Sequence, residues 1–288
     1  MNPSIWSDYY AVLPPEEAVL AFREAGYSHT ELGIDHSRVL LSRSTNTEKT
    51  GMAYRRFLDD HGFSHPQGHL DFEKELTAPD AVDFFKNEIT LFRSIGIQNA
   101  IIHINGGAGL PEAQTLEIQQ TVLQKLLEFV AGTDFTLCIE NLRPNPSVAD
   151  ADGILRWIDL LGGKNLGICL DTGHLHVSNI SMKTTVQTQR EFILKAGSYL
   201  KATHIAGNDG TDDYHLAPFS IKNSVRWDEV VTALRDIGYN GLFNLEVPGE
   251  TKGDPPLPIL KRKLLYLKEL TDFMISDRFP QADTVSVL

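Results

Sequence analysis

Short apolar runs rich in β-branched residues alternate along the chain with longer stretches in which apolar residues recur every three or four positions. The short runs predict strands, and the recurring spacing predicts amphipathic helices. Eight runs are predicted strands: 4–7, 29–34, 63–70, 99–105, 135–141, 166–172, 200–206 and 242–247. The clearest predicted helices between them are 14–27, 79–97, 111–132 and 224–241, where Pro, Glu and Gly stand at starts and ends.

This alternation predicts a parallel sheet whose strands are joined by right-handed crossovers. No G-x-G-x-x-G follows the first strand, which disfavours an open doubly wound sheet. Eight strand–helix units in 288 residues fit a (β/α)8 TIM barrel with α/β architecture. We expect residues 1–288 to form a single domain, with 248–258 as the loop after the last strand and 255–288 as the closing helix and C-terminal tail.

Residues of metal-ligand types lie near the carboxyl ends of consecutive predicted strands, about one β/α unit apart. These residues are His69, His103, Glu140, Asp171, His204 and Glu246. Barrel active sites are built at this end of the strands, so the side chains would point to one place. A structural histidine, or a salt bridge to Arg143 or Lys201, explains any single position but does not explain all of them.

A polar loop, HIAGNDGTDDYHLAP (204–218), adds Asp213 and His215, and the turn LDTGH (170–174) adds His174. Asp213 and His215 are either a further metal pair or residues that cap turns. His176 is expected on the surface. Carboxylates mixed with imidazoles suit Mn²⁺, Mg²⁺, Co²⁺ or catalytic Zn²⁺ better than a structural zinc site, which favours thiolates.

Composition and charge limit the classes of partner that we expect for this chain. The formal net charge is −12 with a pI near 5.3, and there is no basic stripe, so nucleic acid is not an expected partner. Cys138 and Cys169 form no C-x-x-C motif, and each is expected to be a small core residue below the site. The N-terminus does not look like a signal peptide, and no apolar run has membrane length. These features predict a soluble cytoplasmic protein with no membrane partner.

Several of these stretches resemble the xylose-isomerase-like TIM-barrel superfamily, which includes sugar-phosphate isomerases and epimerases and the family 2 apurinic endonucleases. The resemblance covers nearly the whole chain. It lies in EEAVLAFREAGYSHTELGI, IENLRP, LDTGH, HIAGNDGTDDYHLAP and the final W-x-E-V-x-x-x-L-x-x-I-G-Y-x-G-x-x-x-x-E-V. Ala206 and Gly207 depart from the pattern, because relatives often carry His and Asp there.

The resemblance implies a divalent metal held by Glu140, Asp171, His204 and Glu246. It also implies that Glu140 and Glu246 are the catalytic residues that move protons. His69, His103 and His174 match substrate-binding positions of the isomerases. In the endonucleases, which hold three zinc ions, the additional ligands match His69, His103, His174, Asp213 and His215.

Three functions remain open from the sequence. The first is a metal-dependent isomerase or epimerase of a small sugar, polyol or keto-sugar, acting by proton transfer through an enediolate, with dehydration of a cyclic polyol ketone as a related variant. The second is a multi-metal zinc hydrolase or phosphodiesterase. The third is a non-catalytic binding protein on a barrel. Relatives are often dimers or tetramers, so a homo-oligomer is possible.

Overall fold

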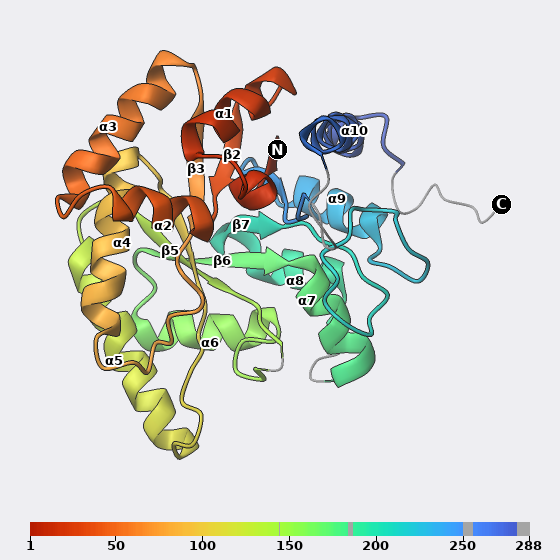
Figure 1. Cartoon of the computed structure of the whole chain (residues 1–288). Coiled ribbons are helices and arrows are strands. Elements are labelled where there is room, and N and C mark those ends of the chain that lie inside the picture. Colours follow the sequence, from red (N-terminus) through yellow and green to blue (C-terminus); the bar gives the residue numbers. More distant parts are fainter. Residues whose placement is uncertain (144, 184–186, 250–255, 281–288) are drawn as a thin grey trace.

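All eight predicted strands are present in the computed structural model, which describes residues 1–143, 145–183, 187–249 and 256–280 (Figure 1). The strands are β1 (Asn2–Ile5), β2 (His29–Leu32), β3 (Ser64–His69), β4 (Asn99–Ile102), β5 (Thr136–Glu140), β6 (Leu166–Asp171), β7 (Leu200–His204) and β8 (Leu242–Leu245). Most are shorter than predicted. The second ends at Leu32, because a helix begins at Ile34.

The strands are parallel and close into a barrel. Six strands pair in the order β2-β3-β4-β5-β6-β7, and β1 pairs with β8. Two bridges join these sheets, from Trp6 to Glu31 and from Ile205 to Leu245. The amide of Ile205 also donates to Asn244 at 2.8 Å, so both open edges of the larger sheet are covered. The chain is therefore a (β/α)8 TIM barrel, and the predicted fold class is confirmed.

The helices pack around the outside of the strands (Figure 1). The α-helices of the described residues are α1 (Pro15–Glu24), α2 (Ile34–Ser42), α3 (Thr47–Asp60), α4 (Ala81–Ile95), α5 (Glu112–Val130), α6 (Ala151–Leu161), α7 (Thr172–Val177), α8 (Gln189–Ala196), α9 (Trp227–Asp236) and α10 (Leu257–Ile275). The four clearest predicted helices correspond to α1, α4, α5 and α9. The crossover from β2 to β3 holds two helices, and Asn46 caps the second by accepting from Lys49.

The main apolar core lies between the strands and the surrounding helices, where large side chains such as Phe92, Leu123 and Trp157 are buried. A smaller buried cluster contains Cys138 and Cys169 with residues of β4 and β7. By strand alternation these cysteines face the barrel interior, one layer below Glu140 and Asp171. Both thiols are free and fully buried, as expected of small core residues.

The closing helix is α10, which lies beside α1 and α9 (Figure 1). Tyr9 donates to the carbonyl of Leu260 at 2.8 Å, and Lys261 pairs with Glu24 at 2.7 Å. Within the predicted 248–258 loop, residues 250–255 lie outside the described residues, as do residues 281–288 of the predicted tail. No helix in the described part of the chain has the length and apolarity needed to span a membrane.

Candidate metal centre

The predicted site residues all lie at the carboxyl end of the barrel. His69, Glu140, Asp171 and His204 are the last residues of β3, β5, β6 and β7, while His103 and Glu246 come just after β4 and β8. His174 lies in α7, and Asp213 and His215 lie in the loop between β7 and α9. Parallel strands of similar length end at the same face, which is why residues so far apart in sequence converge.

Glu140 is the hub of the site and is almost completely buried. Its Oε2 lies 2.8 Å from His103 Nε2 and 3.3 Å from His69 Nε2. Its Oε1 lies 3.2 Å from His204 Nδ1 and 3.3 Å from His174 Nδ1. Four imidazoles from four different barrel positions therefore surround one carboxylate.

Glu140, Asp171, His204 and Glu246 form one candidate metal-binding cluster, which we call the inner cluster. One ligand atom of each lies within 4.8 Å of the others, and all four residues are buried. Within the part of the chain that the structure describes, Asp171 Oδ2 and Glu246 Oε2 have no hydrogen-bond partner. Buried carboxylate oxygens are costly unless something satisfies them, and a divalent cation bound by oxygen and imidazole would do so. The donor set therefore fits a divalent metal.

His174, Asp213 and His215 form a second candidate cluster, the outer cluster. Asp213 Oδ2 lies 2.9 Å from His174 Nε2 and 3.0 Å from His215 Nε2. His215 Nδ1 also lies 3.5 Å from Glu246 Oε2, so the two clusters adjoin. The structure therefore brings Asp213 and His215 next to the inner cluster, and their role as ligands stays a prediction.

Electrostatics separate the two glutamates of the inner cluster. Burial opposes ionisation of Glu140, but the positive charge of His204 and His103 outweighs it and holds the pKa of Glu140 well below its usual range. Burial raises the pKa of Glu246 to about 8, against the opposing effect of His204 and His215. For His204, the nearby carboxylates of Glu246, Glu31 and Glu140 overcome burial and raise its pKa well above the usual range. Bound metal would compete with these protons.

Sequence reasoning missed one buried carboxylate. Glu31 on β2 has no exposed surface, and its Oε2 lies 3.0 Å from His204 Nε2 and accepts a short hydrogen bond from Gln67. His204 thus turns Nδ1 toward Glu140 and Nε2 toward Glu31. The stretch HTELGI carries this glutamate inside a predicted strand, one residue before the strand ends at Leu32, and that position was the available signal.

Arg143 and Lys201 were the alternative salt-bridge partners for individual site residues. Arg143 pairs with Asp212 at 3.0 Å and not with Glu140, and Lys201 is exposed on β7. His176 donates from Nε2 to the carbonyl oxygen of Asn223 at 2.9 Å and belongs to neither cluster. Asn141, from the IENLRP stretch, fixes β6 by bonding the backbone of Asp171 in both directions. Pro144 of that stretch lies outside the described residues.

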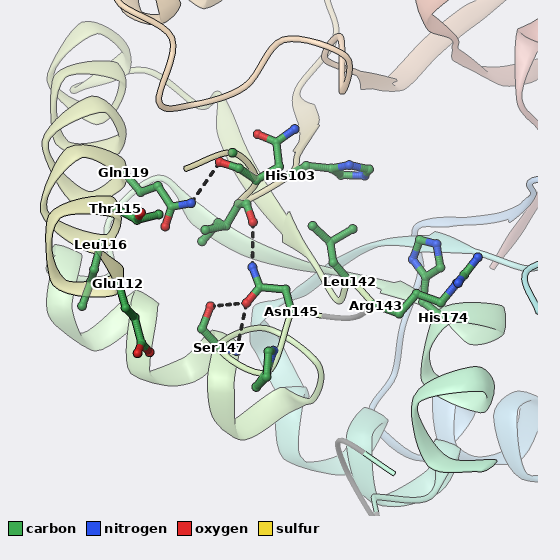
Figure 2. Close-up of a pocket in the computed structure, with 14 residues that line it drawn as sticks. His103, Glu112, Thr115, Leu116, Gln119, Leu142, Arg143, Asn145, Ser147 and His174 are labelled. Atoms are coloured by element: carbon green, nitrogen blue, oxygen red, sulfur yellow. Dashed lines mark hydrogen bonds between the residues drawn. The ribbon is translucent and has the colours of Figure 1, made fainter. Parts of the chain in front are cut away.

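A pocket of about 750 Å³ lies next to the centre (Figure 2). His103 and His174 stand on its metal-cluster side, and Thr115 and Gln119 of α5 stand opposite. The loop after β5 supplies Arg143, Asn145 and Ser147. The site therefore combines a compact group of cation ligands with an adjoining cavity large enough for an organic molecule.

Known proteins resemble this chain in sequence and in fold. The sequence model of the family described as xylose isomerase-like TIM barrel matches residues 19–270. The uncharacterized protein y4fM of Sinorhizobium fredii is 24% identical over 191 residues, which are 62% of this chain and 55% of that protein. The chain thus aligns with only about half the length of that relative. A probable endonuclease 4 of Mycoplasma pneumoniae is 23% identical over 70% of this chain and 72% of its own.

Solved structures confirm the fold. D-psicose 3-epimerase from Clostridium cellulolyticum H10, with D-tagatose, superposes with a TM-score of 0.77 at 16% identity, covering 96% of this chain and 100% of that one. A D-psicose 3-epimerase in the presence of D-fructose gives a TM-score of 0.76 at 17% identity, covering 96% and 99%.

Proposed function

The chain belongs to the xylose isomerase-like TIM-barrel family, and on that premise we propose that it is a divalent-metal-dependent epimerase or isomerase of a small keto-sugar. One observation carries the proposal. Glu140 and Glu246 lie with Asp171 and His204 around one buried point, where Asp171 Oδ2 and Glu246 Oε2 have no hydrogen-bond partner among the described residues. The sugar epimerases among the structural neighbours support this choice of reaction.

Glu140, Asp171, His204 and Glu246 would hold the metal. When bound, it supplies Lewis-acid polarisation of the ketone and stabilises negative charge that develops on the oxygen. The proton chemistry then belongs to the two glutamates: one removes the proton from the carbon beside the ketone and the other returns a proton. Return to the opposite face of that carbon gives epimerisation, and the intermediate in between is an enediolate.

His69, His103 and His174 surround Glu140 on its remaining sides, so they would contact the substrate next to the reacting carbon. His69 is held by its Nδ1, which lies 2.7 Å from the carbonyl of Leu70. Phe72 stacks on His103 with ring centroids 5.4 Å apart and helps to exclude water from that side. These groups would orient a polyhydroxylated substrate and keep the exchangeable proton from bulk solvent.

A zinc-dependent hydrolase is the second candidate. The outer cluster favours it, because His174, Asp213 and His215 offer a separate set of cation ligands beside the inner cluster. The relative described as a probable endonuclease 4 supports the same reaction class. A net charge of −12 disfavours a polyanionic nucleic acid as the substrate, so a small phosphorylated compound fits this candidate better.

Metal content distinguishes the two candidates without knowledge of the substrate. Elemental analysis of protein purified without chelator should give one Mn²⁺, Mg²⁺ or Co²⁺ per chain for the epimerase. Two or three Zn²⁺ per chain, reduced by Asp213→Ala, would favour the hydrolase. A chain that binds no metal even on titration would contradict both candidates.

Proton transfer is tested directly in D₂O. Ketohexoses incubated with the metal-loaded protein should incorporate deuterium at the carbon beside the ketone, seen as loss of that proton's NMR signal. The Glu246→Gln variant should lose this exchange. Release of phosphate from a sugar phosphate, or of the phenol from an aryl phosphodiester, without deuterium exchange in any ketose, would reject the epimerase.

A further inference from the structure

The pocket of about 750 Å³ lies beside the inner cluster and not over it. His103 and His174 belong to both, because each contacts Glu140 and each lines the pocket. The four ligands of the inner cluster do not line it. A ketose bound at the cluster would therefore leave the pocket free, and a substituent on that ketose would extend into it past the two histidines (Figure 2).

The volume of the pocket exceeds the needs of a monosaccharide. A water molecule occupies about 30 Å³ in the liquid, so this space corresponds to roughly 25 waters. Pockets that bind small organic ligands commonly have volumes of about 300–1,000 Å³. Because the reacting ketose would lie at the cluster, the pocket has room for a separate sugar ring.

The far wall offers neutral hydrogen-bonding groups on a rigid frame. Gln119 is 6% exposed, and its Nε2 donates to the carbonyl of Asn105 at 2.9 Å, which leaves its Oε1 without a partner among the described residues. Thr115 lines the same wall. Asn145 is fixed by donating to the carbonyl of Ile104 at 2.8 Å. A few fixed polar groups beside apolar surface suit a hydroxylated ring.

The charge of the pocket does not suit a phosphate. Arg143 is the one lysine or arginine that lines the described pocket, and its guanidinium already donates to Asp212 at 3.0 Å and lies 3.8 Å from Asp213. Glu112 adds a carboxylate to the opposite wall. A phosphate at Arg143 would lie close to the acidic partners of that residue and across from another acid, whereas a neutral sugar meets neither cost.

We propose that this pocket binds a neutral glycosyl unit attached to the reacting ketose, so that the substrate class is a glycosylated keto-sugar and not a free or phosphorylated monosaccharide. The proposal rests on the epimerase function given above for the reacting end. It assigns Leu116, Thr115 and Gln119 of α5 to the recognition of the second unit. Leu116 supplies an apolar contact for one face of that ring.

Three matched probes test the pocket by calorimetry with the metal-loaded full chain. They are D-fructose, isomaltulose (fructose with a glucosyl group on O6) and fructose 6-phosphate, which differ only in the O6 substituent. We expect isomaltulose to bind about 10-fold or more tightly than D-fructose, and fructose 6-phosphate to bind no better than D-fructose. Deuterium exchange into each ketose is recorded on the same samples.

A pair of variants ties the result to α5. Leu116→Trp fills the pocket, and Glu117→Trp makes the same addition at the next exposed position, which does not line the pocket. We expect Leu116→Trp to lower the isomaltulose-to-fructose affinity ratio about 10-fold. The Glu117→Trp control should keep the wild-type ratio. A second pair changes Glu112, which lines the pocket, or Glu117, which does not, to lysine. Glu112→Lys should improve binding of fructose 6-phosphate, and Glu117→Lys should leave it unchanged.

The outcomes separate the two proposals. Equal binding of D-fructose and isomaltulose, unchanged by Leu116→Trp, would overturn the glycosyl pocket even if deuterium exchange occurs. Tighter binding of fructose 6-phosphate than of isomaltulose would overturn it as well. Binding of isomaltulose that depends on Leu116, without deuterium exchange in any probe, would support the pocket and reject the epimerase.

Discussion

Two buried histidines lie in opposite electrostatic environments. One faces the helices around the barrel, which we call the shell, and the other lies at the carboxyl end of the strands, which we call the mouth. His65, at the start of β3, packs against Tyr54 of α3, and burial lowers its pKa to about 3. His204, at the end of β7, is equally buried, yet the pKa is raised well above normal because carboxylates surround it and outweigh the burial. The shell excludes charge, whereas the mouth concentrates it.

The same contrast holds for hydrogen bonding. His65 has partners on both ring nitrogens, with Thr30 Oγ1 at 3.0 Å and the hydroxyl of Tyr54 at 3.2 Å. In the mouth, Asp171 Oδ2 and Glu246 Oε2 have no hydrogen-bond partner among the described residues, and Glu246 Oε2 lies 3.5 Å from a ring nitrogen of His204 and of His215. His65 is therefore satisfied as folded, whereas the mouth offers carboxylate oxygens that a bound cation would satisfy. We therefore expect substitutions in the shell to change mainly the stability of the fold, and substitutions at the mouth to change mainly its function.

The largest effect is expected when a glutamate of the mouth is neutralised. Glu246→Gln should lower kcat/KM for epimerisation by about 10²–10⁴, because the variant loses a proton-transfer group. Initial rates on a ketose, measured with the metal content of each sample known, give the result.

Glu88 of α4 is the matched control in the shell. Burial raises its pKa to about 8, as for Glu246, but it accepts only from the backbone amide of Asp71, at 3.1 Å. Glu88→Gln should leave kcat/KM within about 2-fold. Equal losses in both variants would show that burial of a carboxyl, and not its place at the mouth, is what matters.

A core truncation should produce the opposite result. Phe92 of α4 is fully buried, so Phe92→Ala should lower the free energy of unfolding by about 3–5 kcal/mol through the cavity it creates. Urea denaturation measures this loss. The exposed Met52→Ala of α3 should change stability by less than about 0.5 kcal/mol.

Activity completes the test of the core variant. The folded fraction of Phe92→Ala should keep its kcat/KM at a temperature well below its unfolding transition. A large loss of activity in folded protein would mean that the shell also sets the geometry of the mouth, and the boundary drawn above would be wrong.

A smaller effect is expected at Glu31, which lies behind a metal ligand. Its carboxylate fixes the orientation of His204 by holding Nε2, so Glu31→Gln should weaken metal binding about 10–100-fold. Titration of metal-free protein followed by calorimetry measures the affinity. Glu88→Gln should bind metal like the wild type, and an unchanged affinity in Glu31→Gln would remove Glu31 from the site.

The smallest effect concerns the neutral histidine of the shell. The folded protein keeps His65 unprotonated down to a pKa of about 3, whereas an unperturbed histidine has a pKa of about 6.5. Between these values the unfolded chain binds the extra proton. His65 therefore contributes stability that is complete above pH 6.5 and is lost as the pH falls, by up to about 1.4 kcal/mol per unit.

His65→Asn removes this titration. The variant should be less stable than the wild type at pH 7.5, and the difference should shrink at pH 5.5, as measured by urea denaturation of metal-free protein. Comparing the two proteins at each pH cancels the titration of the mouth histidines, which both proteins share. A difference that does not change with pH would contradict the neutral, shell-bound state of His65.

The sequence predicted the fold because the strand pattern is local. Each run of apolar β-branched residues, such as NAIIHIN and LGICLDT, marks a strand by itself. Boundaries were less accurate, as at Ile34, because a helix N-terminus there competes with the same apolar signal. The two helices between β2 and β3 were not singled out, since that stretch lacks a strong apolar repeat.

Residue type and strand position determined which side chains meet, because the carboxyl ends of eight parallel strands share one face of a barrel. That rule predicts from the sequence alone that Glu140, Asp171, His204 and Glu246 lie together. Only the tertiary structure decided that His204 turns one nitrogen to Glu31 and the other to Glu140, and that a pocket opens beside α5. Ring orientations and cavities depend on distances between elements far apart in sequence, and no local pattern encodes them.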